Sequence, residues 1–267
     1  MKIGEQRTIY YSDELNDEFS GAQITPKVIN KDYVYIHKNH LWDMASAVIQ
    51  NVLSMPIKYI YAKCKLGVKY IGKEKLKPYK KDGYFVYVNH TQPFADTFIP
   101  SLPIFPKRNF FIVNPENVSI KYIGKLVEYL GALPIPCDIG GMKNFIRAVE
   151  TRIEQKHSIT IYPEAHIWPF YTDIRPFKDV SFKYPVTLDK PSFCMTNTYK
   201  RCGRKGDRLR VITYIDGPFF PDRTKSAKEM QRLLRDEIYS CMKERSRNSD
   251  VEYIRYVKRN EDIQEKY

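Results

Sequence analysis

Short apolar segments alternate with helical patterns from residue 82 onward, and this alternation limits the fold more than any other feature. Strand-like runs occur at 84–88, 109–113, 133–136, 158–162, 192–196 and 209–215. Apolar residues recur at helical spacing in 120–130, 142–155 and 224–245. Nearly all-apolar strands that alternate with helices are typical of a parallel sheet covered on both faces. The sequence therefore predicts an α/β domain over residues 82–250, with a mostly parallel central sheet flanked by helices.

The composition narrows the class of protein. Hydrophobic residues make up 43% of the 267-residue chain, which is enough for a substantial core and excludes a disordered protein. The five cysteines include no C-x-x-C pair, which favours reduced thiols over a zinc site, so no metal and no bound cofactor are expected. The opening stretch MKIGEQRTIYYSDE lacks the apolar core of a signal peptide, so secretion is not predicted.

The net charge of +13 is concentrated in two clusters. Nine lysines lie between Lys58 and Lys81 against a single acid, Glu74. The stretch KRCGRKGDRLR (200–210) carries six basic residues against one aspartate. Such clusters attract polyanions, namely nucleic acid, an anionic membrane surface or an acidic carrier protein. The alternative for either cluster is a solvated basic face with no specific partner.

The segment before the first cluster, LWDMASAVIQNVLSMPIKYIY (41–61), has the pattern of an amphipathic helix. Its charge-free part, 44–57, is shorter than the ~20 residues that a spanning helix needs. One interpretation is a helix lying in the membrane interface with its aromatic residues at headgroup level. The other is an ordinary amphipathic helix packed on the domain. Because lysines beside such a helix strengthen binding to anionic lipid, we favour the first. The apolar positions on one face are Leu41, Ala45, Val48, Val52 and Met55.

These features divide the chain into four parts. Residues 1–40, acidic and aromatic, are predicted to form an N-terminal surface extension. Residues 41–81 form the amphipathic, lysine-rich segment, predicted to hold the protein peripherally on the cytoplasmic face of the cell membrane. The α/β domain follows over 82–250. Residues 251–267 are predicted to be a polar C-terminal tail.

A histidine and an aspartate follow the first strand-like run, in YFVYVNHTQPFADTF (84–98). Functional side chains of parallel sheets gather at the carboxyl ends of strands, which is where His90 falls. Pro93 suits the first turn of a following helix, which would place Asp96 about one turn into it, facing the imidazole. A carboxylate that accepts one ring N–H leaves the other ring nitrogen free as a base. The alternative is a turn histidine beside an early-helix acid favoured by the helix dipole.

A second strand-like run ends in a polar site within SITIYPEAHIWPFYTDIRPFKD (158–179). Together the two stretches resemble the glycerolipid acyltransferase family, whose best-known members are the 1-acylglycerol-3-phosphate acyltransferases. The family's first motif, N-H-x-x-x-x-D, is similar to NHTQPFAD, and its third, F-P-E-G-T-R followed by F-K, to YPEAHIW and RPFK. Its second is similar to GALPIPC (131–137). The resemblance implies that His90 and Asp96 are catalytic and that Glu164 serves acceptor binding or site integrity.

The sequence also departs from the family's motifs. Five residues, not four, separate His90 from Asp96, so the turn between them must absorb an extra residue. The arginines that end the second and third motifs, which in the family help hold the acceptor's phosphate, become Cys137 and Ile167. Neither side chain can make bidentate contacts to a phosphate. Arg175 and Lys178 are predicted as substitute ligands; the alternative is an acceptor with another headgroup.

The resemblance implies an acyltransferase of phospholipid biosynthesis. An acyl group would pass from a thioester of acyl carrier protein or coenzyme A to the hydroxyl of a lysophospholipid-like acceptor, 1-acylglycerol-3-phosphate or a related lipid, with His90 as general base. Transfer would be direct, because no serine or cysteine occupies a strand–elbow setting. The 200–210 cluster could dock acyl carrier protein, although a solvated hairpin loop explains it equally well.

Two other functions stay open at this point. One is an acyl-thioester hydrolase on the same scaffold, in which water replaces the acceptor. The other is a non-enzymatic basic protein that binds nucleic acid, for which the sequence offers no recognition motif, so no nucleic-acid partner is predicted. A metal site built from His90, His157 and His166 matches no known ligand spacing.

Overall fold

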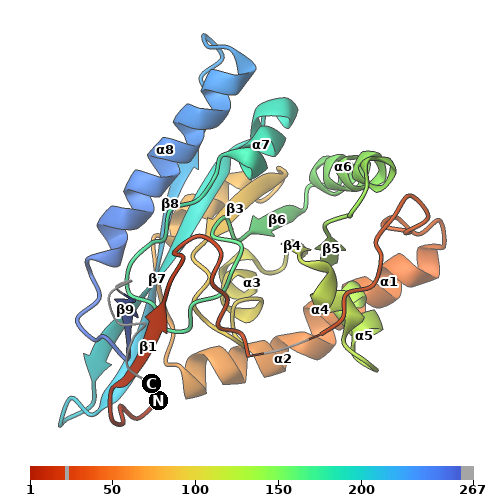
Figure 1. Cartoon of the computed structure of the whole chain (residues 1–267). Helices are drawn as coiled ribbons and strands as arrows, with labels where there is room; N and C mark the ends of the chain where they lie inside the picture. The colour runs from red at the N-terminus through yellow and green to blue at the C-terminus, as the bar shows by residue number, and fades with distance from the viewer. Residues whose placement is uncertain (22–23, 260–267) are drawn as a thin grey trace.

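A seven-stranded sheet forms the centre of the molecule in the computed structural model, which describes residues 1–21 and 24–259 (Figure 1). Five neighbouring strands are parallel, and the sheet reverses direction only between β7 and β8. The predicted α/β fold with a mostly parallel sheet is therefore confirmed. In spatial order the strands are β2 (Lys69–Ile71), β8 (Arg208–Phe219), β7 (Ser192–Cys202), β3 (Tyr84–Val88), β6 (Ser158–Ile161), β4 (Asn109–Val113) and β5 (Ala132–Pro134).

Helices cover both faces of this sheet because its strands are apolar on both sides. Alternate residues of a strand point to opposite faces, and in β3 Phe85 and Tyr87 pack in one core cluster while Tyr84 and Val86 pack in another. The first cluster is covered by α6 (Ile139–Glu154), α7 (Lys183–Leu188) and α8 (Ala227–Ser246). The second lies against α3 (Phe98–Ile104) and the 3-10 helix η3 (Lys73–Tyr79).

The remaining short helices depart from the predicted pattern. The stripe at 120–130 does not form one helix, because the chain turns at Tyr122, whose φ of 66° lies in the left-handed region. Helix α4 (Pro115–Ser119) precedes this turn and α5 (Gly124–Tyr129) follows it. A further 3-10 helix, η4 (Val180–Phe182), leads into α7.

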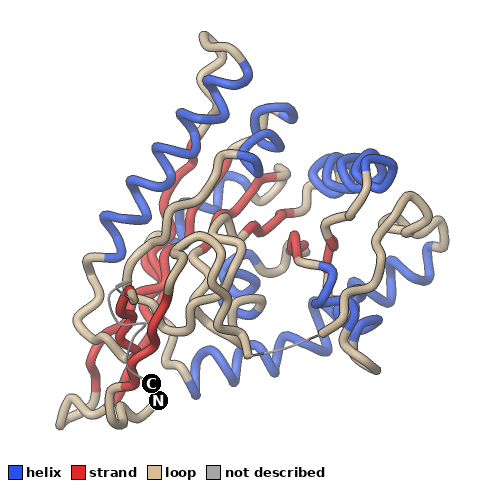
Figure 2. The backbone as a smooth tube through the Cα atoms, viewed as in Figure 1, coloured by secondary structure: helices blue, strands red, loops and turns tan. Residues whose placement is uncertain are grey.

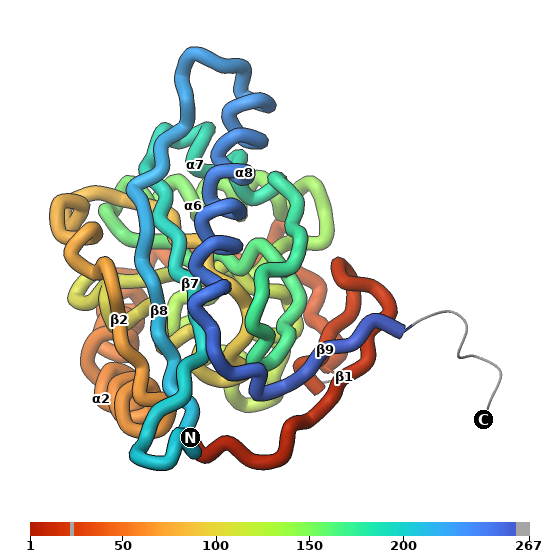
Figure 3. The backbone as a smooth tube through the Cα atoms, turned by 90° about the vertical axis from the view of Figure 1, so that its left-hand side faces the viewer, coloured from red at the N-terminus to blue at the C-terminus, as the bar shows by residue number. Residues whose placement is uncertain are grey.

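Segments near both ends of the chain, 7–11 and 254–258, belong to the fold, which corrects the predicted surface extension and polar tail. Strand β1 (Arg7–Tyr11) pairs in parallel with β9 (Ile254–Lys258), and Figure 3 shows the two running side by side. Ile29 and Tyr35 are buried in the main core cluster. Composition concealed the contacts of residues 1–40, because most acids of this segment are exposed while a few apolar residues reach the core. Of the predicted tail, residues 260–267 lie outside the described part of the chain.

The predicted amphipathic segment forms an almost unbroken helical run over residues 40–65 (Figure 2). It consists of α1 (His40–Val48), a π-helical stretch η1 (Ile49–Leu53), α2 (Ser54–Tyr59) and a second π-helical stretch η2 (Ile60–Lys65). The helical run continues through Pro56, which has no backbone N–H to donate and lies just after the π-helical stretch η1.

The polarity of this helical run is inverted. The side facing the domain is polar: Asp43 forms ion pairs with Arg108 (3.0 Å) and Arg152 (3.2 Å), and the buried Ser46 donates to the Tyr129 carbonyl (2.6 Å). Gln50 is buried on the same side. The outward side is apolar and exposed. We call this surface the apolar band; it comprises Leu41, Met44, Val48, Val52, Leu53, Ile57 and Ile60, which are 43–65% exposed.

No helix in the described part of the chain is long and apolar enough to cross a bilayer.

Candidate active site

The predicted site residues follow two adjacent strands of the parallel sheet. Strands β3 and β6 pair in register, with Tyr87 opposite Ile161, so the turns that follow them start side by side. His90 lies in the turn after β3, and Glu164 lies in the loop after β6. The topology therefore brings together two motifs that are 74 residues apart in sequence.

His90 and Asp96 are in contact. The imidazole Nδ1 lies 2.5 Å from Asp96 Oδ2, with the two side chains 24% and 7% exposed. Burial raises the pKa of Asp96, although its hydrogen bond with His90 opposes that shift. Since a carboxylate oxygen accepts from an N–H, this contact favours the tautomer with the proton on Nδ1. Nε2, on the partly exposed ring, is then left as an unprotonated nitrogen.

Asp96 does not lie in a helix, contrary to the sequence prediction. Helix α3 begins only at Phe98, and residues 93–97 form turns. The turn closes through hydrogen bonds at Gln92: its carbonyl accepts from Asp96 N (3.1 Å), and its own N–H donates to Asp96 Oδ2 (3.1 Å). The extra residue relative to the family's spacing is thus absorbed by a non-helical turn that still directs the carboxylate to the ring.

The side chain of Gln92 anchors this turn to the neighbouring strand. It is 2% exposed, and its Nε2 donates to the hydroxyl of Tyr199 on β7 (2.9 Å). The Tyr199 hydroxyl is also 2.7 Å from Thr91 Oγ1. Asn89 adds a second link to β7, because its Oδ1 accepts from Asn197 N (2.8 Å) and its Nδ2 donates to Asn197 O (3.1 Å). Both sides of the His90 turn are therefore fixed to β7.

Glu164 joins the His90 turn to the loop after β6. Its Oε2 accepts from the backbone N–H of His90 (2.8 Å), and its Oε1 accepts from the backbone N–H of Arg175 (2.8 Å). The side chain is buried, and burial raises the pKa of its carboxyl although Arg175 and both N–H donors oppose the rise. Both oxygens serve the protein's own backbone, which places Glu164 as a positioning residue for His90.

Arg175 and Lys178, the predicted phosphate ligands, are not placed alike. Arg175 is 1% exposed; its guanidinium donates to the carbonyls of Glu14 and Glu164 (3.2 and 3.3 Å) and also to the His166 carbonyl. The group is therefore occupied in holding the loop to the N-terminal segment and does not face a ligand. Lys178 is exposed.

The altered third motif keeps the backbone shape that its glycine would adopt. Ala165 has a φ of 63°, in the left-handed region where glycine is favoured, so the turn is preserved with a small strain in an alanine. Ile167, in place of an arginine, is buried. The Glu18 carboxylate lies beside it, accepting from Ile167 N (3.3 Å) and contacting His166 Nδ1 (3.0 Å). Cys137, the other replacement, is exposed and donates to the Ile29 carbonyl.

Tyr162 is a site residue that the sequence prediction missed. Its ring lies 4.6 Å from the His90 ring, centroid to centroid, and its hydroxyl donates to the Asp96 carbonyl. It therefore contacts both members of the pair. The signal was its position: Tyr162 directly follows β6, the strand that pairs with β3, and an aromatic residue there can reach the turn after β3.

The three histidines of the alternative metal site do not come together. His166 contacts Glu18, and His157 packs against Phe110, where burial and two nearby arginines lower its pKa to about 4. Within residues 1–21 and 24–259, the group with metal-ligand geometry is Cys194, Asp216 and Cys241, which shares no residue with the predicted site.

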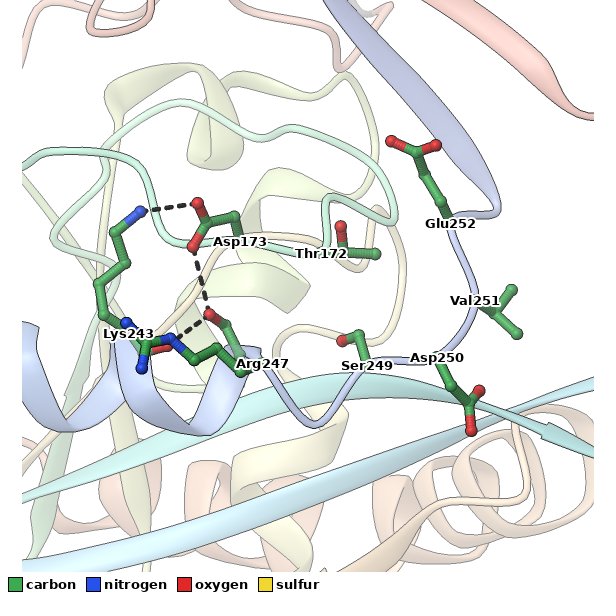
Figure 4. Close-up of a pocket in the computed structure, with 9 residues that line it drawn as sticks. Thr172, Asp173, Lys243, Arg247, Ser249, Asp250, Val251 and Glu252 are labelled. Atoms are coloured by element: carbon green, nitrogen blue, oxygen red, sulfur yellow. Dashed lines mark hydrogen bonds and ion pairs between the residues drawn. The ribbon is translucent and has the colours of Figure 1, made fainter.

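Figure 4 shows a pocket of about 600 Å³ between the loop around Thr172 and the end of α8. Lys243 forms an ion pair with Asp173 there (2.7 Å), and Ser246 donates to the same aspartate (3.2 Å). Neither His90 nor Asp96 nor Glu164 lines it. The cavity is therefore separate from the His90–Asp96 pair.

Comparison with known proteins shows that the chain shares its fold with a solved structure. No protein-family profile and no curated protein sequence matches the chain. Among solved structures, the chain is similar to the crystal structure of the 1-acyl-sn-glycerophosphate (LPA) acyltransferase, PlsC, from Thermotoga maritima, with a TM-score of 0.52 and 15% identity. The likeness covers 80% of this chain and 98% of that one. At this identity it shows that the two share a fold, of the kind that the motifs imply.

We expect Glu164→Gln to weaken both stability and activity. An amide has one acceptor oxygen, so one of the two buried N–H groups would lose its partner, which costs about 1–3 kcal/mol. Urea denaturation should show this loss, and kcat should fall because the His90 backbone is released. The matched control is Glu154→Gln, at the exposed end of α6. Unchanged stability in Glu164→Gln would contradict the positioning role.

Proposed function

We propose that the protein is a membrane-associated acyltransferase that moves a fatty acyl group from an acyl thioester to a hydroxyl of a lysophospholipid-like acceptor. The observation that carries the proposal is the contact between His90 Nδ1 and Asp96 Oδ2 (2.5 Å), on the turn after β3. The pair has a free ring nitrogen, a buried carboxylate and rigid anchors on two neighbouring strands. The shared fold with a solved acyltransferase supports the same reaction class.

The proposed reaction is a direct transfer. His90 Nε2 takes the proton of the acceptor hydroxyl as the oxygen attacks the thioester carbonyl carbon. A C–O bond forms and a tetrahedral intermediate results; the C–S bond then breaks, and the leaving thiolate recovers the proton from the imidazolium. Asp96 holds the ring in the required tautomer and stabilises its positive charge. Glu164 and Tyr162 position the ring without reacting.

The acceptor's headgroup is the part of this proposal that most needs a direct test. Arg175 is occupied by backbone carbonyls, and the carboxylate of Glu18 lies beside Ile167, where the resemblance implies an arginine. A phosphomonoester gains nothing from an adjacent carboxylate, so acceptors with neutral headgroups belong in the assay beside 1-acylglycerol-3-phosphate. Acyl carrier protein and coenzyme A thioesters are the proposed donors.

The decisive experiment combines cell lipids with the purified enzyme. Lipid mass spectrometry of cells that overproduce the wild type or His90→Ala should reveal a diacylated product only with the wild type. The purified protein is then given an acyl thioester with that product's lysolipid, with other lysolipids, or with water alone. Thiol release that needs the lysolipid supports transfer. Release that is equal without it would identify a thioester hydrolase instead.

The inverted helical run supports the proposed attachment to membranes. An ordinary amphipathic helix buries its apolar side against the domain, whereas this one buries Ser46 and Gln50, pairs Asp43 with Arg108 of the domain, and exposes the apolar band. The run also reaches the site: Tyr61 contacts Phe94 and Phe98, which lie four and eight residues after His90 (ring centroids 5.0 and 5.8 Å). A membrane-bound band would therefore hold the His90 turn close to lipid substrates.

We expect Val48→Asp together with Val52→Asp to release the protein from vesicles that contain phosphatidylglycerol. Each change replaces the proposed apolar contact with lipid by a charge, so the partition coefficient should fall by more than about tenfold. Raising the salt to 1 M should weaken wild-type binding only in part, because screening removes the lysine attraction and leaves apolar burial. Vesicle co-sedimentation measures both effects.

The control for this experiment is Val180→Asp. Val180 is 56% exposed, comparable to the two band residues, but lies on η4 next to α7, on the other side of the molecule from α2. It should bind vesicles like the wild type. Equal binding by all the variants would mean that the apolar band does not contact the membrane.

A further inference from the structure

Two cysteines far apart in sequence meet beneath helix α8, away from the predicted site. Cys194 lies on β7 and is fully buried, and Cys241 lies on the facing side of α8 and is partly exposed. Their sulfur atoms are 3.8 Å apart. The Cys194 thiol donates to the Cys241 sulfur, and the two atoms would have to approach from this distance to the ~2.05 Å of a disulfide bond.

The surroundings of the pair decide between a metal site and a redox site. The Asp216 carboxylate lies within 4.8 Å of both sulfurs and would complete a three-ligand group. However, its oxygens already accept from Lys75 Nζ (2.7 Å), Arg245 Nε (2.8 Å) and Arg245 Nη2 (2.9 Å). A divalent cation would have to break these hydrogen bonds and lie beside two positive side chains. The site therefore disfavours a metal ion.

The same surroundings make the two thiols unequal. The hydrogen bond from the Cys194 thiol lowers the pKa of Cys241, and Arg245 acts in the same direction, while partial burial and Asp216 oppose them. For Cys194, that hydrogen bond and complete burial raise the pKa. Cys241 is thus both the more accessible sulfur and the more readily ionised one, which are the two properties of a cysteine that reacts first with an oxidant.

We propose that Cys194 and Cys241 form a dithiol that a peroxide oxidises to an intramolecular disulfide between β7 and α8. The Cys241 thiolate attacks the peroxide: an S–O bond forms, the O–O bond breaks, and hydroxide or alkoxide leaves. The Cys194 sulfur then attacks the Cys241 sulfenic acid; the S–S bond forms, the S–O bond breaks, and the departing hydroxide takes the Cys194 proton as water. Two thiols and one peroxide thus give a disulfide, an alcohol or water, and water.

This modification site is independent of the proposed acyl transfer, yet it lies on the strand that supports the site. Cys194 is three residues before Asn197, whose backbone N–H and carbonyl both bond to the Asn89 side chain beside His90. A disulfide would fix α8 to this part of β7.

The test uses a variant that keeps only the pair, with Cys64→Ser, Cys137→Ser and Cys202→Ser. The purified variant is treated with hydrogen peroxide, the remaining thiols are alkylated, and its intact mass and tryptic peptides are measured. We expect both alkylation sites to disappear, a linked peptide that contains Cys194 and Cys241, and full recovery by dithiothreitol. Adding Cys241→Ser should leave Cys194 reduced and open to alkylation after unfolding.

Three outcomes would overturn the proposal. In the first, both thiols stay reduced under peroxide that oxidises Cys202 in the wild type. In the second, Cys241 accumulates as a sulfinic acid with no linked peptide. In the third, the reduced protein retains stoichiometric zinc after incubation with zinc chloride and dialysis, and Cys241→Ser abolishes that retention, which would make the pair a metal site.

Discussion

His90→Ala should lower the rate of acyl transfer by about 10²–10⁴-fold, since a positioned general base contributes about that much. The loss should appear in kcat, because the ring acts on the proton that moves in the transition state and adds little to thioester binding. Initial rates of thiol release, measured with the lysolipid identified from cell lipids, provide the test. Turnover above about one per cent of the wild type would exclude His90 as the base.

The fold should survive this change. The His90 side chain is 24% exposed, so truncation to alanine leaves no closed core cavity. The backbone anchor also remains, because Glu164 binds the N–H of residue 90 whatever its side chain. Circular dichroism and thermal unfolding should confirm both points. The matched control is His40→Ala at the exposed start of α1, which should transfer acyl groups like the wild type.

The sheet and its order of elements follow from features that a sequence displays directly. The runs 84–88 and 109–113 are apolar at almost every position, so burial on both faces fixes them as β3 and β4 with the predicted bounds. The turn after β3 was predictable for the same reason, since a polar residue after such a strand emerges at the sheet's carboxyl edge. The contact between His90 and Asp96 agrees with that expectation.

The misplaced features depend on contacts between distant segments. Strands β1 and β9 are polar and aromatic, and only their pairing with each other makes them strands. An arginine is a typical phosphate ligand, but the guanidinium of Arg175 donates to carbonyls of the N-terminal segment and of its own loop. No local pattern records such partners. The sequence around Asp96 also led to a wrong prediction, because Pro93 is a helix-start signal. The hydrogen bonds of Gln92 to Asp96 and Tyr199 stabilise a non-helical turn there instead.

Asp96→Asn should preserve the fold and lower kcat by about 10²–10⁴-fold. Asp96 Oδ2 accepts from the N–H of Gln92 and also contacts the imidazole, so an asparagine with its oxygen in that place preserves the turn. A neutral amide oxygen is a weaker acceptor than a carboxylate, so it holds the proton on Nδ1 less firmly and favours the tautomer with an unprotonated Nε2 less strongly. An amide also gives an imidazolium no charge to pair with. KM for the thioester should change little, because Asp96 is 7% exposed and touches no substrate.

A double variant shows whether the two residues act as one unit. If Asp96 works only through the ring, adding Asp96→Asn to His90→Ala should cost little beyond His90→Ala alone, since the group that Asp96 serves is already gone. If the two losses instead multiply, Asp96 acts on the reaction by a separate route. The next carboxylate to consider beside His90 is Glu164, but its oxygens are bound to the N–H groups of His90 and Arg175 and do not approach the ring as Asp96 does. Geometry therefore makes Asp96 the partner of the His90 ring, and the comparison of the single and double variants measures its contribution to the rate.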